Sequence, residues 1–283
     1  MGLSIGDANR GARRAAGNPI YRFAVRAGYV ARGVLYVYMG YAAFRIAMTA
    51  SPQQADQQAS LVVISGFPLG IAILAAGMVA IAAYSLWGFV RAIYDPLHRG
   101  HDATGVVTRL GFAWSGLSYA ALLIFALALL THASGASQGD QVPKLAARLL
   151  AAPFGSLLTE AIGLVGIATG LGQFIEAWRA TFKKDEKRSQ MSESEKEVTD
   201  LLGRAGFISR GVAFTLMGWF IFLAGSHHDA NHATGFTGTF TYILAQPYGR
   251  LLLGLVALGF IALGLHSVVL ARYIRMPGDS SSA

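Results

Sequence analysis

One glutamate in this chain stands where an acidic side chain could do chemistry. Glu160 follows Pro153 by seven residues inside an otherwise uncharged stretch, which places it about 10 Å along a helix. An ionised carboxylate at that depth is costly, so Glu160 should face protein or water. It would then take up a proton or pair with an arginine in a transport path, or accept a hydrogen bond from a nearby hydroxyl or backbone donor in a structural role.

Histidine is the other residue type here that could bind a metal or move a proton. His266 lies near the end of the last apolar stretch, where it could bond Glu176 or be a core histidine with a local partner. Two further groups lie in loops: His227, His228, Asp229 and His232 in one, and Asp95, His98 and His101 in the other. Neither group has a known metal-site spacing. The chain also lacks cysteine, so we expect no metal, no cofactor, no catalytic residue and no enzymatic activity.

The composition indicates what must hold these residues. Of 283 residues, 54% are hydrophobic and 13% are charged, whereas about 25% are charged in a typical soluble domain. Such an excess of apolar surface indicates a protein that faces lipid. The net charge of +8 does not indicate nucleic acid, because the basic residues stand beside apolar runs, as in membrane proteins. We therefore expect membrane lipid or another membrane protein as the partner, and no nucleic acid.

Six stretches are candidates for membrane-spanning helices. Four approach or exceed the length of about 20 residues that crosses the hydrocarbon core. They are 57–90, 110–130, 161–175 with an extension back to 149 across Glu160, and 251–271. Two shorter stretches, 33–44 and 211–225, each follow an arginine.

A threefold repeat identifies the two shorter stretches as spans as well. Its first motif, Arg-x-Gly-aromatic followed by a second glycine and a second aromatic residue, begins at Arg26, Arg109 and Arg204. Its second motif, Pro-x-Gly, occurs at 68–70, 153–155 and 247–249. Because the middle copy contains a clear first span, we predict an all-α integral membrane protein. Its six transmembrane helices would form three parallel tandem hairpins with pseudo-threefold symmetry about the membrane normal.

The repeated residues form one stripe on the first helix of each copy, because spacings of three and four bring them to one face. Glycine lets a neighbouring backbone approach closely and aromatic rings can cover the contact, so we predict that the stripe packs helices together. The stripe consists of Tyr29, Gly33, Tyr36 and Gly40 in the first copy, Phe112, Gly116 and Tyr119 in the second, and Phe207, Gly211, Phe214 and Gly218 in the third.

Arginines and prolines flank the stripes. We expect the arginines to bind lipid headgroups or the carbonyl ends of neighbouring helices; they are Arg26, Arg32, Arg109, Arg204 and Arg210. The prolines of the second motif suit the first turn of the returning helix, where no backbone donor is lost.

With these motifs in order, the sequence resembles the bacterial membrane proteins defined by domain of unknown function 1206. That domain is a pair of transmembrane helices that occurs three times per protein. The resemblance covers residues 21–275, and the middle copy departs from it with Ser115 where the others have Arg32 and Arg210. The family implies no activity, so the resemblance supports the architecture and leaves the function open.

Lysine and arginine predict the orientation. If the N-terminus is cytoplasmic, four basic residues fall outside: Arg45, Lys144, Arg148 and Arg250. The other 19 of the 23 fall inside, so the positive-inside rule predicts a bacterial inner-membrane protein with both termini cytoplasmic. An aromatic belt near the inner interface would then contain Trp87, Trp114, Trp178 and Tyr273.

The predicted segments follow from the repeats. They are a basic cytoplasmic tail over 1–18, repeats over 19–98, 99–182 and 199–275, a charged and solvated cytoplasmic linker over 183–198, and a C-terminal tail over 276–283. In the linker, Ser192 and Glu195 have the spacing of a capping box. On the outer side, Val142, Leu145 and Leu149 indicate a short interfacial helix.

Two functions fit this architecture. The first is a non-enzymatic scaffold or accessory subunit that binds lipid or another membrane protein, which the nearly charge-free spans and short loops favour. The alternative is a small transporter or channel with a path near the pseudo-threefold axis, which Glu160 and the abundant glycine favour. Against the alternative, the repeats are parallel and not inverted. We predict the first function.

Overall fold

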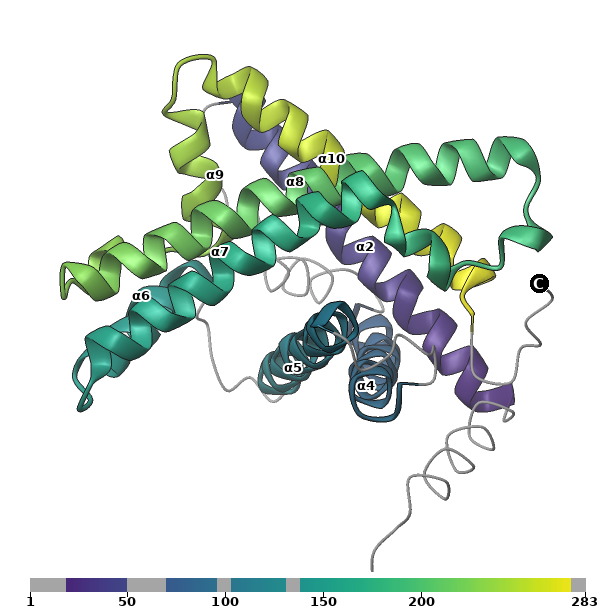
Figure 1. Ribbon diagram of the computed structural model, residues 1–283, viewed down its shortest axis with the longest axis horizontal. Coiled ribbons are helices and arrows are strands. Elements are labelled where there is room, and N and C mark those ends of the chain that lie inside the picture. The colour runs from purple at the N-terminus through teal and green to yellow at the C-terminus, as the bar shows by residue number, and fades with distance from the viewer. Residues whose placement is uncertain (1–18, 50–69, 96–102, 131–137, 276–283) are drawn as a thin grey trace, which may run out of the picture.

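The computed structural model describes residues 19–49, 70–95, 103–130 and 138–275, and every regular element in these ranges is a helix (Figure 1). The α-helices are α2 (Pro19–Thr49), α4 (Gly70–Tyr94), α5 (Ala103–Leu130), α6 (Gln138–Leu150), α7 (Gly155–Arg179), α8 (Glu193–Ser226), α9 (Phe236–Leu244) and α10 (Gly249–Tyr273). Short 3₁₀ helices are η1 (Thr181–Asp185), η2 (Arg188–Gln190) and η3 (Ala230–His232). The prediction of an all-α fold is confirmed over these residues.

Four helices in the described ranges are long and apolar enough to cross a membrane: α4 from Gly77 to Tyr94, α7, α8 and α10. They indicate a multi-pass membrane protein. The short predicted stretch 211–225 lies within α8, which has ample length. The other two helices with predicted spans, α2 and α5, are not among the four. α2 carries four arginines and five tyrosines, which lower its hydropathy.

The most extensive helix contacts join neighbouring repeats and not the two helices of one repeat. α4 packs on α5, α7 packs on α8, and the last helix, α10, packs on the first, α2. Figure 1 shows α7 beside α8 and, crossing them, α2 beside α10. Contacts of α10 with α8 and of α2 with α4 join these pairs. Each predicted hairpin is therefore one repeat of the sequence, but its two helices are not the ones that pack most closely. Each tightly packed pair combines helices from two repeats.

The motif glycines lie within these pairs, at the contact between the two paired helices. Each faces the second helix of the preceding copy, with the third copy preceding the first. A Cβ added to the glycine would lie 2.8, 3.0 or 3.1 Å from a backbone oxygen of that helix, for Gly33 against Gly264, Gly116 against Ser85 and Gly211 against Gly170. Gly40 and Gly218 are equally close to α10 and α7. A side chain at these positions would force the two backbones apart.

The aromatic residues of the stripes pack on rings from other helices or from the segment after α7. The pairs and their centroid distances are Tyr29–Tyr84 at 4.9 Å, Tyr119–Tyr84 at 4.7 Å, Tyr36–Phe260 at 6.0 Å, Phe207–Phe182 at 5.3 Å and Phe214–Phe236 at 5.6 Å. The last of these rings belongs to α9, a helix that the sequence analysis does not predict. α9 buries Phe240 and Ile243 in a core shared with α2 and α10.

The Pro-x-Gly motif forms a turn before the second helix of a repeat. α7 and α10 begin at Gly155 and Gly249, so their prolines lie two residues before the helix; the prediction of a first-turn position is wrong there. The intervening Phe154 and Tyr248 adopt left-handed φ angles of 61° and 60°. A Cβ on either glycine would lie 2.1 Å from a carbonyl oxygen of the preceding helix, so the chain can turn back only with glycine there. Pro68 lies outside the described residues.

Two local predictions outside the spans are confirmed. The Ser192 hydroxyl accepts a hydrogen bond from the Glu195 N–H at 3.3 Å, and the Glu195 carboxylate accepts one from the Ser192 N–H at 2.8 Å, which is a capping box at the start of α8. α6 covers the predicted short helix. It buries Ala146 and Leu150, however, and leaves Leu145 of the predicted apolar face exposed.

Two residues predicted for the aromatic belt are buried. Trp87 is 1% exposed and Tyr273 is 6% exposed, whereas Trp114 and Trp178 are 45% and 83% exposed. The Tyr273 hydroxyl donates a hydrogen bond to the Glu195 carboxylate at 2.7 Å. The belt prediction is therefore wrong for Trp87 and Tyr273, because their rings fill space between packed elements.

The charged segment after α7 is folded against the ends of α8 and α10, where we expected a solvated linker. The Lys187 N–H donates to the Tyr273 carbonyl and the Arg275 N–H donates to the Asp185 carbonyl, both at 2.8 Å. Phe182 is buried beside Phe207 and His266. This segment, residues 181–192, therefore ties the end of the last helix to the start of α8.

Charged side chains strengthen this attachment. Lys183 Nζ lies 2.6 Å from Asp200 Oδ2, and Arg188 Nη1 lies 2.7 Å from Asp200 Oδ1 and 3.1 Å from Glu186 Oε2. Glu186 is fully buried, and its other carboxylate oxygen has no hydrogen-bond partner. Burial raises the pKa of the Glu186 carboxyl above its ordinary value, although Arg188 acts in the opposite direction and the charges of Asp200 and Asp185 add to the rise.

Alanine at Gly33 should destabilise the fold. Its Cβ would lie 2.8 Å from a backbone oxygen of α10, and overpacking of this kind costs about 1–3 kcal/mol. Gly172 on α7 has nothing within 4 Å of an added Cβ, so Gly172→Ala should be neutral or gain up to about 1 kcal/mol of helix propensity. Thermal unfolding in detergent measures both variants. Equal unfolding temperatures would mean that the Gly33 contact is not close.

Glu186 should make the stability of the protein depend on pH. Because its pKa is higher in the folded chain, the stability associated with the neutral acid is complete below the ordinary glutamate pKa of about 4.3 and is lost as the pH rises through the raised value. Glu186→Gln should therefore match the wild type at low pH and unfold at a higher temperature near neutral pH. Glu193→Gln, at an exposed pair with Lys196, is the control. If the unfolding temperatures of Glu186→Gln and the wild type differ by the same amount at every pH, the raised pKa of Glu186 is contradicted.

Candidate functional site

Three arginines from three helices converge on a group of tyrosines inside the bundle. They are Arg32 of α2, Arg91 of α4 and Arg210 of α8, and the charges of all three reach the Tyr84 hydroxyl. We call these arginines, together with Tyr29, Tyr36, Tyr84 and Tyr119, the arginine–tyrosine cluster. Three of these seven residues are stripe residues: Tyr29 and Tyr36 of α2 and Tyr119 of α5.

Arg32 and Arg210 share one aromatic ring. Arg32 Nη1 donates a hydrogen bond to Tyr84 Oη at 2.5 Å, and its guanidinium carbon lies 5.5 Å from the ring centroids of both Tyr84 and Tyr36. The Arg210 guanidinium carbon lies 5.8 Å from the same Tyr36 ring and 4.9 Å from the ring of Phe214. Tyr36 therefore lies next to two cations from different repeats.

Arg91 is the most deeply buried of the three arginines, with 5% of its surface exposed. Its guanidinium carbon lies 4.2 Å from the ring centroid of Phe112 and 5.7 Å from that of Trp87. Phe112 is the stripe residue of α5, so α4 and α5 enclose this cation between aromatic faces.

The positive charge of the cluster has no carboxylate partner in the described part of the chain. No ion pair there involves Arg32, Arg91 or Arg210, although the charge of Asp185 reaches Arg91 from a longer distance. A cation–π contact is worth about 0.5–2 kcal/mol, whereas removing an ion from water costs several kcal/mol. The aromatic rings therefore offset only part of the cost, and the cluster is electrostatically complementary to an anion.

The structure brings together some of the predicted arginines and separates others. Arg32 and Arg210 belong to the cluster inside the bundle. Arg109 binds a helix end: its Nε donates to the Ala92 carbonyl at 2.8 Å and its Nη2 donates to the Ile93 carbonyl at 3.0 Å. Arg26 and Arg204 are exposed.

Sequence reasoning missed Arg91 and the part played by α4. Arg91 directly follows the predicted span 57–90 and comes one helical turn after Trp87, which is the available signal for a stacked cation. Ser115 of α5 occupies the position that corresponds to Arg32 and Arg210 in the other two repeats. Its side chain hydrogen-bonds Tyr84. The departure of the middle repeat from the motif thus places a neutral side chain where the other repeats have arginine.

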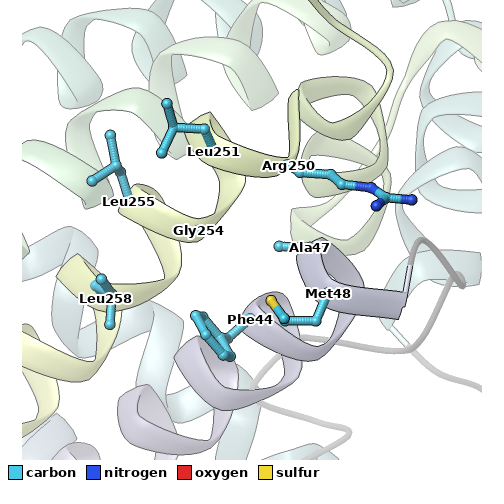
Figure 2. A pocket seen from close by; sticks show the side chains of 8 residues that line it. All are labelled: Phe44, Ala47, Met48, Arg250, Leu251, Gly254, Leu255 and Leu258. Atoms are coloured by element: carbon cyan, nitrogen blue, oxygen red, sulfur yellow. The ribbon is translucent and has the colours of Figure 1, made fainter. Parts of the chain in front are cut away.

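Two apolar grooves lie between neighbouring helices of the described part of the chain. The larger, of about 360 Å³, lies between α2 and α10, and its lining consists of Phe44, Ala47, Met48, Arg250, Leu251, Gly254, Leu255 and Leu258. Figure 2 shows the leucines of α10 on one side and Phe44 and Met48 on the other, with the Arg250 side chain extending over the end of α2. A second groove, of about 270 Å³, lies between α4 and α5 and is lined by Ala92, Ile93, Val106, Arg109, Leu110 and Ala113.

Comparison with known proteins agrees with this threefold construction. The family described as Domain of Unknown Function (DUF1206) matches residues 27–95, 110–180 and 205–273 in tandem. The chain belongs to the DUF1206 family. This match confirms the resemblance and the repeat architecture. The DUF1206 chain is also 30% identical over 251 residues to "Uncharacterized protein YxxB" of Bacillus subtilis (strain 168), an alignment that covers 89% of this chain and 90% of the relative. No solved structure matches.

In this DUF1206 protein, two of the predicted intramembrane polar residues, Glu160 and Glu176, belong to α7, and the third, His266, belongs to α10. Glu160 lies on α7 against Gly225 of α8 and is partly exposed. The Glu176 carboxylate accepts a hydrogen bond from the Thr181 hydroxyl. His266 is buried, hydrogen-bonds the backbone of Thr199 and leaves Nδ1 without a partner.

The loop histidines are held by polar contacts on the surface. His227 Nδ1 lies 3.3 Å from His232 Nε2, and His228 Nδ1 lies 2.7 Å from Ser156 Oγ. Over the described residues, no three His, Cys, Asp or Glu side chains are arranged to hold a metal ion. His98 and His101 lie outside those residues.

Replacing Glu160 by glutamine tests the transport alternative. The described residues give its carboxylate no hydrogen bond or ion pair, so Glu160→Gln should keep the wild-type unfolding temperature. If Glu160 titrates in a proton or cation path, pH-driven flux into liposomes should be present in the wild type and absent in this variant. We expect no such flux in either protein. Flux that depends on Glu160 would establish transport.

Proposed function

We propose that this DUF1206 protein is a non-enzymatic, six-span membrane protein that binds membrane lipid as a scaffold or accessory subunit, with another membrane protein as a further partner. Its spans would form a ring with pseudo-threefold symmetry about the membrane normal. Supporting the ring, the second helix of each copy packs on the first helix of the next, and α10 packs on α2.

The proposed orientation in the bacterial inner membrane has both termini in the cytoplasm. Its support is the distribution of charge, with 19 of the 23 basic residues on the cytoplasmic side. In this orientation, α2 runs outward and α10 runs inward. The groove of Figure 2 then lies in the outer leaflet, because it is formed by the end of α2 and the start of α10.

That groove is the observation that carries lipid binding. Its lining is aliphatic and aromatic apart from Arg250, which lies at one end. An empty apolar groove in a bilayer would lose dispersion contacts, so an acyl chain is its natural occupant. Arg250 begins α10 near the membrane surface, where a long basic side chain can reach a lipid phosphate.

Filling the groove should reduce lipid retention. Gly254 lines it and has nothing within 4 Å of an added Cβ, so Gly254→Phe should place a ring where the acyl chain lies. The purified variant should retain fewer phospholipids than the wild type, as counted by native mass spectrometry during stepwise removal of lipid.

Gly172→Phe on α7 is the matched control, because its added side chain also meets open space but lies outside the groove. This variant should retain as much lipid as the wild type. Equal retention by both variants and the wild type would show that the groove does not hold lipid, and would remove the observation on which the proposed function rests.

A further inference from the structure

We infer that the arginine–tyrosine cluster is a binding site for the phosphate group of an anionic phospholipid. The ligand would come from the leaflet at the end of the bundle where α2 begins and α4 ends, which is the inner leaflet in the proposed orientation. This inference rests on the proposed lipid-binding function and adds a second site, with a headgroup chemistry, to the acyl-chain groove.

Uncompensated charge is the first reason. Arg91 is 5% exposed, and a guanidinium remains protonated in proteins because its pKa lies far above physiological pH. Arg32 and Arg210 lie beside the same Tyr36 ring, so the cations also repel one another. The described residues supply no carboxylate within ion-pair distance of these three side chains. A bound anion would remove both the repulsion and the unpaired charge.

The unpartnered polar atoms give the second reason, since all of those in the cluster can donate hydrogen bonds. The Nε atoms of Arg32, Arg91 and Arg210 are buried without a partner, and so is the hydroxyl of Tyr119. Arginine Nε is only a donor, and the Tyr119 hydroxyl can donate. A phosphate group offers several charged acceptor oxygens and is a preferred ligand of arginine.

The surroundings favour a lipid as the source of the phosphate. Arg32 lies six residues, about 9 Å, beyond Arg26 on α2, within reach of a headgroup for a long side chain. Arg91 is three residues from Tyr94, the last residue of α4, at the bundle end where Arg109 binds helix carbonyls. The groove between α4 and α5 at this end is apolar apart from Arg109. An acyl chain in this groove would lie against Ala92, the residue that follows Arg91.

The repeat explains why there is one such site. Arg32, Ser115 and Arg210 occupy equivalent positions on α2, α5 and α8, and two of them bond the Tyr84 hydroxyl. Arg91 of α4 provides the third cation. The cluster therefore needs residues from all three copies, and a single two-helix repeat could not form it.

The test compares full-length protein in nanodiscs of phosphatidylcholine alone and of phosphatidylcholine mixed with phosphatidylglycerol. The variant is Arg210→Gln, because Arg210 contributes ring contacts and no hydrogen bond to the bundle. Arg179→Gln is the matched control: Arg179 is the last residue of α7, is exposed, and its replacement changes the net charge equally. Thermal unfolding and retention of phosphatidylglycerol by native mass spectrometry are the readouts.

Phosphatidylglycerol should raise the unfolding temperature of the wild type and of Arg179→Gln, and Arg210→Gln should lose this stabilisation. Its affinity for phosphatidylglycerol should fall about tenfold or more, as expected for the loss of one charge-assisted hydrogen bond. In phosphatidylcholine alone, Arg210→Gln should be at least as stable as the wild type, because it removes an unpaired charge. Arg210→Lys, which keeps the charge, should retain part of the effect and serves if the glutamine variant does not fold.

Three results would overturn the inference. Equal stabilisation of all variants by phosphatidylglycerol would exclude the cluster as the site. Inorganic phosphate that stabilises the wild type in phosphatidylcholine as strongly as phosphatidylglycerol does, and only when Arg210 is present, would exclude the lipid source. If phosphatidylglycerol does not raise the unfolding temperature of the wild type, the cluster is excluded as a phospholipid site. In that case, groove-dependent retention tested with Gly254→Phe decides separately whether the proposed lipid-binding function survives.

Discussion

Close backbone contact between helices of neighbouring repeats is the constraint on which the rest of this structure depends. At Gly33 an added Cβ would lie only 2.8 Å from a backbone oxygen of the facing helix, and at Gly116 and Gly211 it would lie 3.0 and 3.1 Å from one. In a membrane, lipid tails are as apolar as the helices, so association relies on close packing and not on the exclusion of water. The repeated glycine is therefore the element that selects which helices pair.

This constraint also explains why the hairpins of the sequence are not the packing units. Each motif glycine faces the second helix of the preceding copy, and Gly33 of the first copy faces Gly264 of the last. The first and last helices are thereby held together, although they are far apart in the chain. Residues 181–192 reinforce the arrangement at one end, where they bind both the start of α8 and the end of α10.

The arginine–tyrosine cluster follows from the same contacts. Arginine precedes the motif glycine by one residue in the first and third copies, so the packing that buries the glycine also carries the arginine into the bundle. Tyrosines accompany the cations and contribute ring faces and one hydrogen bond to Arg32. Carboxylates do not accompany them within the described residues, which distinguishes the cluster from the ion-paired group around Asp200. The charges around Asp200 are neutralised by side chains of the same chain, whereas the arginine–tyrosine cluster is suited to an anionic ligand.

The sequence by itself determined the helical class, the threefold repeat, the family and the position of the packing stripe, because these depend on local composition and spacing. The capping box at Ser192 is equally local, and it too could be predicted. Tertiary structure alone decided which faces meet. It buried Trp87 and Tyr273, which were expected at an interface, and it folded the charged segment onto the bundle. It also brought Arg91 beside two arginines of other helices. Their meeting depends on contacts between helices that are far apart in the chain, such as α2 and α10, which periodicity along one helix does not encode.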